Sequence, residues 1–207
     1  MQARGKPRVR VLHASPDTQP VDIHVDGTPA IVGVAYGEVS PYEELPAGHH
    51  TADVYPMTAA APAEPLLHAG IETHAGEDYT LAVVGRTGHL EPILLLDSTS
   101  APAGERAKVR LFHTSPDAPP LDLAVANRPP LFENVAYKDV TPFQEAAAEV
   151  VDLHFRPSGS ATPLITLPDY TLGDGYLYTF VALGLLRGTP AFMIMPLVET
   201  IEMRLPT

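Results

Sequence analysis

Hydrophobic and polar residues alternate along most of the chain, in short runs separated by turn-forming residues. Such runs are typical of β-strands with one buried face, whereas an amphipathic helix needs an apolar period of about 3.6 residues. No long window keeps that helical period, because proline interrupts most candidates. Seven short strands spaced in this way indicate an antiparallel immunoglobulin-like β-sandwich. In the first half of the chain the predicted strands are 8–13, 21–27, 34–42, 49–56, 65–73, 78–85 and 90–97.

Much of this pattern occurs a second time, about one hundred residues later. Residues 9–29 and 109–129 share 10 identities in 21 positions, and residues 34–44 and 135–145 share 6 in 11. Collinear matches of this kind indicate an internal duplication, and the stretch between the copies is small, polar and proline-bearing, as linkers are. We therefore predict an all-β protein of two tandem immunoglobulin-like antiparallel β-sandwiches. The predicted boundaries are 8–98 for repeat 1, 99–107 for the linker and 108–207 for repeat 2.

The composition narrows the classes of partner. A formal net charge of −12 argues against nucleic acid, because a phosphate backbone needs a lysine- and arginine-rich surface, and against adsorption to anionic lipid. No apolar run reaches the roughly 18 residues of a membrane-spanning helix. Cysteine is absent, which excludes thiolate catalysis and thiolate metal ligation. The residues before Pro7 lack the apolar core of a signal peptide, so any leader is expected to be missing from this chain.

The most conspicuous shared motif is His-x-Ser-Pro-Asp, at 13–17 and again at 113–117. A hydrolytic triad is one interpretation. On an extended chain, however, His13 and Ser15 stand about 6.5–7 Å apart, beyond hydrogen-bond reach, and no glycine-flanked nucleophile elbow is present. The motif is better explained as a turn after a strand. His13 and His113 are then expected to pack at the edge of the sandwich and to hydrogen-bond into that turn.

The stretches "VRVLHASPDTQPVDIHVDG" and "VAYGEVSPYEELPAGHHTADVYP" resemble the bacterial domain-of-unknown-function 4397 family. The resemblance covers about 190 residues as two units, and it implies export to the cell surface or envelope, where such modules often occur in tandem. It supplies no reaction, ligand or catalytic residue. The second unit departs from the pattern at 125–130, where the Asp-Gly pair of the predicted hairpin turn is missing.

Histidine and charge are divided unequally between the copies. Seven of the nine histidines lie in repeat 1, and residues 8–99 hold 3 basic and 13 acidic groups, against 6 and 10 in residues 107–200. On the strand at 21–25 the period of two puts Asp22, His24 and Asp26 on the face opposite the apolar residues. The second copy has alanine in place of His24 and Asp26, so this polar row belongs to repeat 1 alone.

Imidazole is a common ligand of copper and zinc, and carboxylates nearby can ligate the metal or orient the ring. The sequence therefore offers a copper or zinc site on repeat 1, built from His24, one of His49 and His50, and His74 or His68, with Asp22 and Asp26 beside it. Adjacent histidines on a strand point to opposite faces, so at most one of His49 and His50 can join His24. Copper superoxide dismutases also mount histidines on an immunoglobulin-like sandwich, although their closely spaced His-x-His pattern is missing here.

Two hypotheses of function follow. The first is a non-enzymatic cell-envelope or secreted module that acts by contact with a protein or cell-surface component. The second is a copper or zinc protein with its site on repeat 1, which as an enzyme would dismutate superoxide. The apolar stretch 184–207, with Phe192, Met193 and Met195, is predicted to form the last strands of repeat 2 and could present a docking edge.

Overall fold

A computed structural model describes residues 5–57, 64–97 and 100–200 of the chain. The chain divides into two compact units, residues 1–98 and 99–207, and every regular element described in them is a β-strand. Among the described residues, no helix is long and apolar enough to cross a membrane. The fold is therefore all-β with two similar halves, as the alternation and the duplication predicted.

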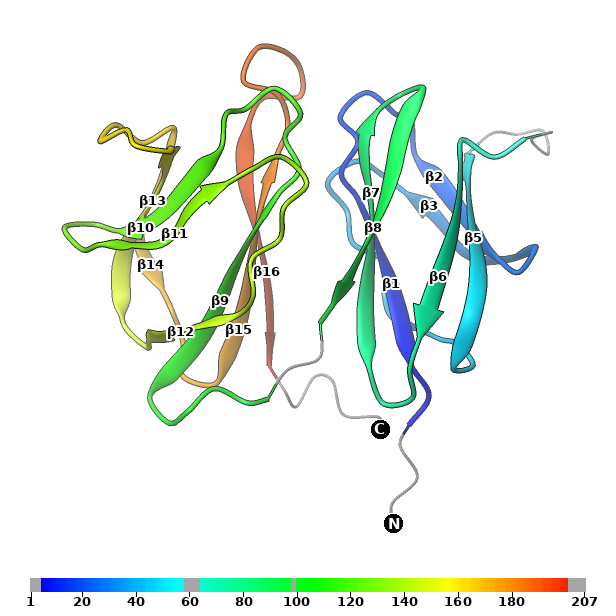
Figure 1. Ribbon diagram of the computed structural model, residues 1–207, viewed down its shortest axis with the longest axis horizontal. Coiled ribbons are helices and arrows are strands. Elements are labelled where there is room, and N and C mark those ends of the chain that lie inside the picture. Colours follow the sequence, from blue (N-terminus) through cyan, green and yellow to red (C-terminus); the bar gives the residue numbers. More distant parts are fainter. Residues whose placement is uncertain (1–4, 58–63, 98–99, 201–207) are drawn as a thin grey trace. The chain divides into compact units, whose positions relative to one another are not determined.

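Unit 1 consists of two four-stranded sheets, with strand orders β4-β1-β7-β8 and β3-β2-β5-β6 (Figure 1). One core is formed from the inward faces of both sheets, and it includes Val11 of β1, Ile23 of β2, Val54 of β5 and Leu81 of β7. The strands are β1 (Arg8–His13), β2 (Val21–Val25), β3 (Thr28–Val34), β4 (Glu43–Glu44), β5 (Gly48–Pro56), β6 (Leu67–Thr73), β7 (Asp78–Arg86) and β8 (His89–Leu96).

Unit 2 repeats this topology strand for strand, with orders β12-β9-β15-β16 and β11-β10-β13-β14. Its first strand begins at Arg106, inside the range predicted as linker. Because residues 9–27 and 109–127 hold equivalent strands, the comparison of the two copies position by position is sound. The strands are β9 (Arg106–His113), β10 (Leu121–Val125), β11 (Pro130–Val135), β12 (Gln144–Ala147), β13 (Val150–Pro157), β14 (Ile165–Thr171), β15 (Tyr176–Leu183) and β16 (Met193–Thr200).

The structure corrects the expected antiparallel pairing in one place in each unit. Strand β1 runs parallel to β7, with Val9 opposite Tyr79, and β9 runs parallel to β15, with Val109 opposite Tyr178. Between the two parallel strands the chain forms β2 and β3 in the opposite sheet, returns as the short strand β4 antiparallel to β1, and forms β5 and β6 in the opposite sheet before β7. Parallel strands need such a long crossover connection, whereas antiparallel neighbours can be joined by a tight turn.

The strand predicted at 34–42 is also wrong, since β3 begins earlier and ends at Val34. The chain then turns, and only an isolated bridge between Val39 and Leu12 marks the rest of the predicted strand. The predicted hairpin turn is present in repeat 1, where Asp26 and Gly27 have φ of 51° and 77°. Repeat 2 makes the equivalent turn without glycine, because Asn127 takes a φ of 59°, a region that asparagine tolerates.

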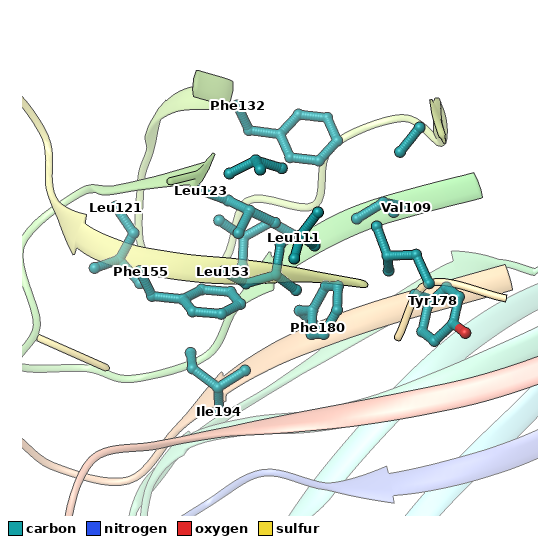
Figure 2. Close-up of a cluster of buried hydrophobic side chains, with 14 of the residues drawn as sticks. Val109, Leu111, Leu121, Leu123, Phe132, Leu153, Phe155, Tyr178, Phe180 and Ile194 are labelled. Atoms are coloured by element: carbon teal, nitrogen blue, oxygen red, sulfur yellow. The ribbon is translucent and has the colours of Figure 1, made fainter. Parts of the chain in front are cut away.

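The core of unit 2 contains more aromatic side chains than that of unit 1. Figure 2 shows Phe155 and Phe180 among leucine and valine side chains from both sheets. Their ring centroids lie 5.5 Å apart in an edge-to-face arrangement, and both residues are fully buried. Phe192, predicted as part of a docking edge, instead packs against this core. Phe192 and Ile194 therefore contribute to the core of unit 2, whereas Met193 is 45% exposed.

A buried polar network crosses the β1-β7 sheet of unit 1. The Asp97 carboxylate, whose side chain is 0% exposed, accepts hydrogen bonds from Tyr42 (2.9 Å) and Thr80 (2.5 Å) and lies 3.5 Å from the Arg10 guanidinium. Arg10 also donates to the Thr80 hydroxyl and lies over the Tyr42 ring, 4.6 Å from its centroid. In unit 2, Arg110 donates to Thr179 in the same way, so the arrangement belongs to the common architecture.

Candidate functional site

The two shared histidines have structural roles. His13 and His113 are fully buried, and each ring accepts at Nδ1 the backbone N–H of the serine two residues on, at 3.3 Å. Their Nε2 atoms donate to the carbonyl oxygens of Gln19 (3.1 Å) and Pro119 (3.0 Å). Burial lowers the pKa of both imidazoles below the ordinary histidine value. The expected packing and turn hydrogen bonds are thus confirmed, and both rings are neutral at pH 7.

The other polar atoms of the motif are also used by the fold. The Ser15 hydroxyl bonds to Thr18 at 2.7 Å, and the Ser115 hydroxyl donates to the carbonyl of Gly184 at 2.7 Å. Asp17 accepts the backbone N–H of Thr87 at 2.9 Å, 70 residues away in the sequence. The motif therefore connects the end of β1 to the hairpin between β7 and β8. Its serine hydroxyl does not bond to the histidine, as a catalytic triad would require.

His24, the centre of the predicted metal set, lies on the outer face of the β2-β5 sheet. Its ring lies against that of Tyr55, with centroids 4.6 Å apart, and its residue pairs across the strands with Asp53. Asp53 in turn bonds to the His68 ring on β6. His49 is four residues along β5 from Asp53, about 13 Å at the rise of a β-strand. The structure thus brings His24 near Asp53 and His68, and not near His49.

The two carboxylates beside His24 serve the fold. Asp22 accepts the backbone N–H of Gly33 at 2.7 Å, where β3 is irregular, and Asp122 accepts that of Asn134 at 2.9 Å in repeat 2. This role is shared by both copies and explains why the first aspartate of the row was kept in the second. The second carboxylate, Asp26, bonds to a histidine ring.

That histidine is His50, which turns inward while His49 turns out to solvent, as the alternation of strand side chains predicted. His50 Nδ1 lies 2.7 Å from an Asp26 carboxylate oxygen, and Nε2 lies 2.8 Å from the carbonyl of Pro46. Both neighbours are acceptors, so both ring nitrogens carry protons, and the Asp26 hydrogen bond raises the pKa of His50. The His50 bond likewise lowers the pKa of Asp26. A doubly protonated ring has no lone pair for a metal ion.

A second group of exposed side chains gathers at the end of β5 and β6. Glu72 Oε1 lies 3.7 Å from His49 Nε2 and 3.8 Å from His74 Nε2. His74 Nδ1 lies 3.1 Å from the Tyr79 hydroxyl, which donates to Glu77. As they stand, no three His, Asp or Glu side chains in the described parts of the chain are arranged to hold a metal ion. Of the predicted metal residues, His49 and His74 are nevertheless brought together.

A groove of about 520 Å³ runs along β3 in unit 1. One wall is the edge strand itself, residues 30–34, and the other is formed by residues between β3 and β4 together with Glu43 of β4. Val32 lies on this edge with 70% of its surface exposed. The residues of the opposite wall are Glu38, Val39, Ser40, Pro41 and Glu43.

Comparison with known proteins settles the family. Residues 7–124 and 107–201 each match the family model described as "Domain of unknown function (DUF4397)". The chain belongs to this family. The resemblance seen in the sequence is therefore confirmed, with the domain present twice in tandem.

Other comparisons add little to this DUF4397 assignment. No curated protein matches the chain. Among solved structures, a "putative cell adhesion protein" from Bacteroides ovatus is similar at 12% identity, over 96% of this chain and 98% of that one. Its TM-score is 0.24, and a likeness this distant carries no argument about fold or function.

Some residues of the first DUF4397 domain were not among the predicted site residues. Glu72 is one of them, although it stands two residues before His74 and so faces the same side. Asp53 and Tyr79 could be found only from the register, because Asp53 pairs with His24 on one side and His68 on the other. Sequence spacing alone does not tell which residues of neighbouring strands are opposite each other.

Proposed function

We propose that the protein is a non-enzymatic interaction module of the cell envelope, and that the groove beside β3 in repeat 1 binds an extended segment of a partner protein. The observation that carries this proposal is the exposed valine on an edge strand next to the groove. The family resemblance supports the envelope location, and the net charge opposes nucleic acid and anionic lipid as partners.

An edge strand can pair with an added strand, because its backbone N–H and C=O groups are hydrogen-bonded to a neighbouring strand on one side only. Strand β3 pairs with β2 and is the last strand of its sheet. Adding a strand in this way gives affinity through main-chain hydrogen bonds, and pockets for alternate side chains give specificity. The groove of about 520 Å³ lies where such a segment would run.

The second DUF4397 domain provides a comparison inside the same chain. Ile31 pairs with Ile23 and Phe132 pairs with Leu123, so Glu133 stands where repeat 1 has Val32. Proteins protect edge strands against unwanted pairing with charged residues and proline. Both edges carry a proline at the equivalent position, Pro29 and Pro130, but only the edge of repeat 2 adds an exposed glutamate. Repeat 1 has the exposed apolar residue Val32 at the position of Glu133.

The charge around the groove indicates the chemistry of the bound segment. Glu38 and Glu43 line it and are exposed, and repeat 1 carries 13 acidic groups against 3 basic ones. Complementary charge speeds association and excludes like-charged partners. We therefore infer that the bound segment is extended, basic and rich in β-branched residues.

This proposal is tested with a defined peptide, eight residues long, in which valine alternates with lysine and threonine. We expect it to bind the full chain and to shift the backbone amide signals of β3 in an NMR titration. A version with glutamate in place of lysine is expected to bind at least about tenfold more weakly, because it meets Glu38 and Glu43.

The matched variant is Val32→Glu, which gives the first edge the residue found in the second. It is expected to weaken peptide binding at least about tenfold while the chain stays folded, since the position is exposed. Equal binding by Val32→Glu and the unchanged chain, or shifts that leave the β3 amides unaffected, would refute the proposed site.

A further inference from the structure

The exposed histidines at the end of β5 and β6 lie on one face because of strand register. His49 on β5 pairs directly with Glu72 on β6, and His74 follows Glu72 by two residues. Side chains of directly opposed residues are neighbours, and residues two apart on a strand share a face. Three side chains that can each ligate a metal are therefore placed side by side at this end of repeat 1.

The two distances from Glu72 to the histidine nitrogens approach those between neighbouring ligand atoms around a metal ion. Tetrahedral zinc with ligands at about 2.0–2.1 Å has neighbouring ligand atoms about 3.3–3.4 Å apart. Glu72 Oε1 lies 3.7 Å from His49 Nε2 and 3.8 Å from His74 Nε2, only a few tenths of an ångström wider. All three side chains are more than half exposed, so they can rotate inward to close around an ion.

The neighbouring tyrosine fixes which nitrogen of His74 is free. The Tyr79 hydroxyl carries a single proton, as a tyrosine does at neutral pH. That single proton is donated to the Glu77 carboxylate. The tyrosine oxygen must therefore accept from His74 Nδ1, at 3.1 Å, as it does from the His74 backbone N–H. In the neutral ring this leaves the Nε2 lone pair turned toward Glu72.

We propose that His49, Glu72 and His74 bind a zinc ion, with water in the fourth position. The Glu77–Tyr79–His74 chain is the outer hydrogen bonding that metal-ligating histidines ordinarily have, since it holds the ring and its tautomer in place. Two imidazoles and one carboxylate with an open position form a donor set typical of zinc. Without an ion, the unprotonated Nε2 of His74 and the Glu72 carboxylate oxygen would face each other with lone pairs, which is unfavourable. A zinc ion between them removes this repulsion. The site is independent of the groove beside β3.

Repeat 2 retains the tyrosine and lacks the ligands. Tyr178 corresponds to Tyr79, and its hydroxyl accepts the backbone N–H of Gly173 at 2.8 Å, just as Tyr79 accepts that of His74. The register Val150–Thr171 matches His49–Glu72. Valine, threonine and glycine thus stand where repeat 1 has histidine, glutamate and histidine. The tyrosine is common architecture, and the three candidate ligands are confined to repeat 1.

The test is isothermal titration of zinc sulfate into the untagged full chain after treatment with a chelator. We expect one zinc ion per chain, and at least about tenfold weaker binding after His49→Gln, Glu72→Gln or His74→Gln. The matched controls are His24→Gln, which alters a partly buried histidine on the outer face of the same sheet, and His68→Gln, which alters an exposed one; both should leave zinc affinity unchanged. Absence of stoichiometric zinc binding, or a loss caused by the controls and not by the ligand variants, overturns the proposal.

Tyr79→Phe separates a positioning role from a merely structural one. It removes the hydroxyl that holds His74, so we expect roughly tenfold weaker zinc binding and, by NMR, a mixture of His74 tautomers in the metal-free protein. An unchanged zinc affinity together with an unchanged His74 tautomer would show that the tyrosine does not position the ring.

Discussion

Replacing Asp97 by alanine is expected to destabilise unit 1 by about 3–5 kcal/mol, because it leaves the buried Arg10 guanidinium without its carboxylate. Thr80 and Tyr42 also lose the acceptor of their hydroxyl protons. Amide hydrogen exchange of β1 and β7 in the full chain is the measurement, since it reports opening strand by strand. A cost of this size speeds exchange at least about a hundredfold, at roughly 1.4 kcal/mol per factor of ten.

The matched control is Glu44→Ala in the same sheet. Glu44 faces Lys6 at 3.3 Å, but both side chains are more than half exposed, so their removal should cost less than about 1 kcal/mol. If the two substitutions accelerate exchange equally, the buried network does not stabilise the sheet as described.

Phe155→Ala is expected to destabilise unit 2 by a similar amount, about 3–5 kcal/mol, because it removes a fully buried ring and leaves a cavity against Phe180. Figure 2 shows the two rings in the middle of the core, so neighbouring leucines can refill only part of the space. Exchange of the β10 and β13 amides should accelerate at least about a hundredfold.

Val150→Ala is the control on the same strand. Val150 is 60% exposed, and a surface substitution of this kind changes stability by about 0.5 kcal/mol or less. An equally mild effect of Phe155→Ala would mean that the ring is not part of a close-packed core.

Much of the fold could be predicted from the sequence, because the pattern of buried residues has the period of a strand. Val21 and Ile23 are buried as expected, and the Asp-Gly turn follows them. The parallel pairing of β1 with β7 could not be predicted in this way. Alternation tells which face of a strand is buried, but it does not give the direction of the neighbouring strand. The predicted strand 34–42 was wrong for a related reason. Apolar and polar residues alternate after Val34, but these residues do not form a strand.

The candidate sites were harder to predict, because they depend on cross-strand register. Sequence comparison singled out His24, since repeat 2 has alanine there, yet the register places it opposite Asp53 and away from His49. The Asp-Gly turn at 26–27 could be predicted from the sequence. The hydrogen bond between the Asp26 carboxylate and the His50 ring could not. The structural role of His13 and His113 could be expected, because the extended spacing to the serine argued against a triad and favoured a turn. Asp22 was counted with the metal candidates, although its aspartate and its role are shared with Asp122.

The central claim is that the polar residues of the motif shared by both copies build the sandwiches, whereas the candidate zinc ligands His49, Glu72 and His74 are confined to repeat 1. A pH titration of all nine histidine rings by NMR tests it most directly. Because burial lowers their pKa, His13 and His113 should titrate below the ordinary histidine value and stay in the Nε2–H tautomer, while His50 titrates above that value beside Asp26. If His13 and His113 instead titrate as exposed histidines do, the shared motif is not part of the buried framework and the account is contradicted.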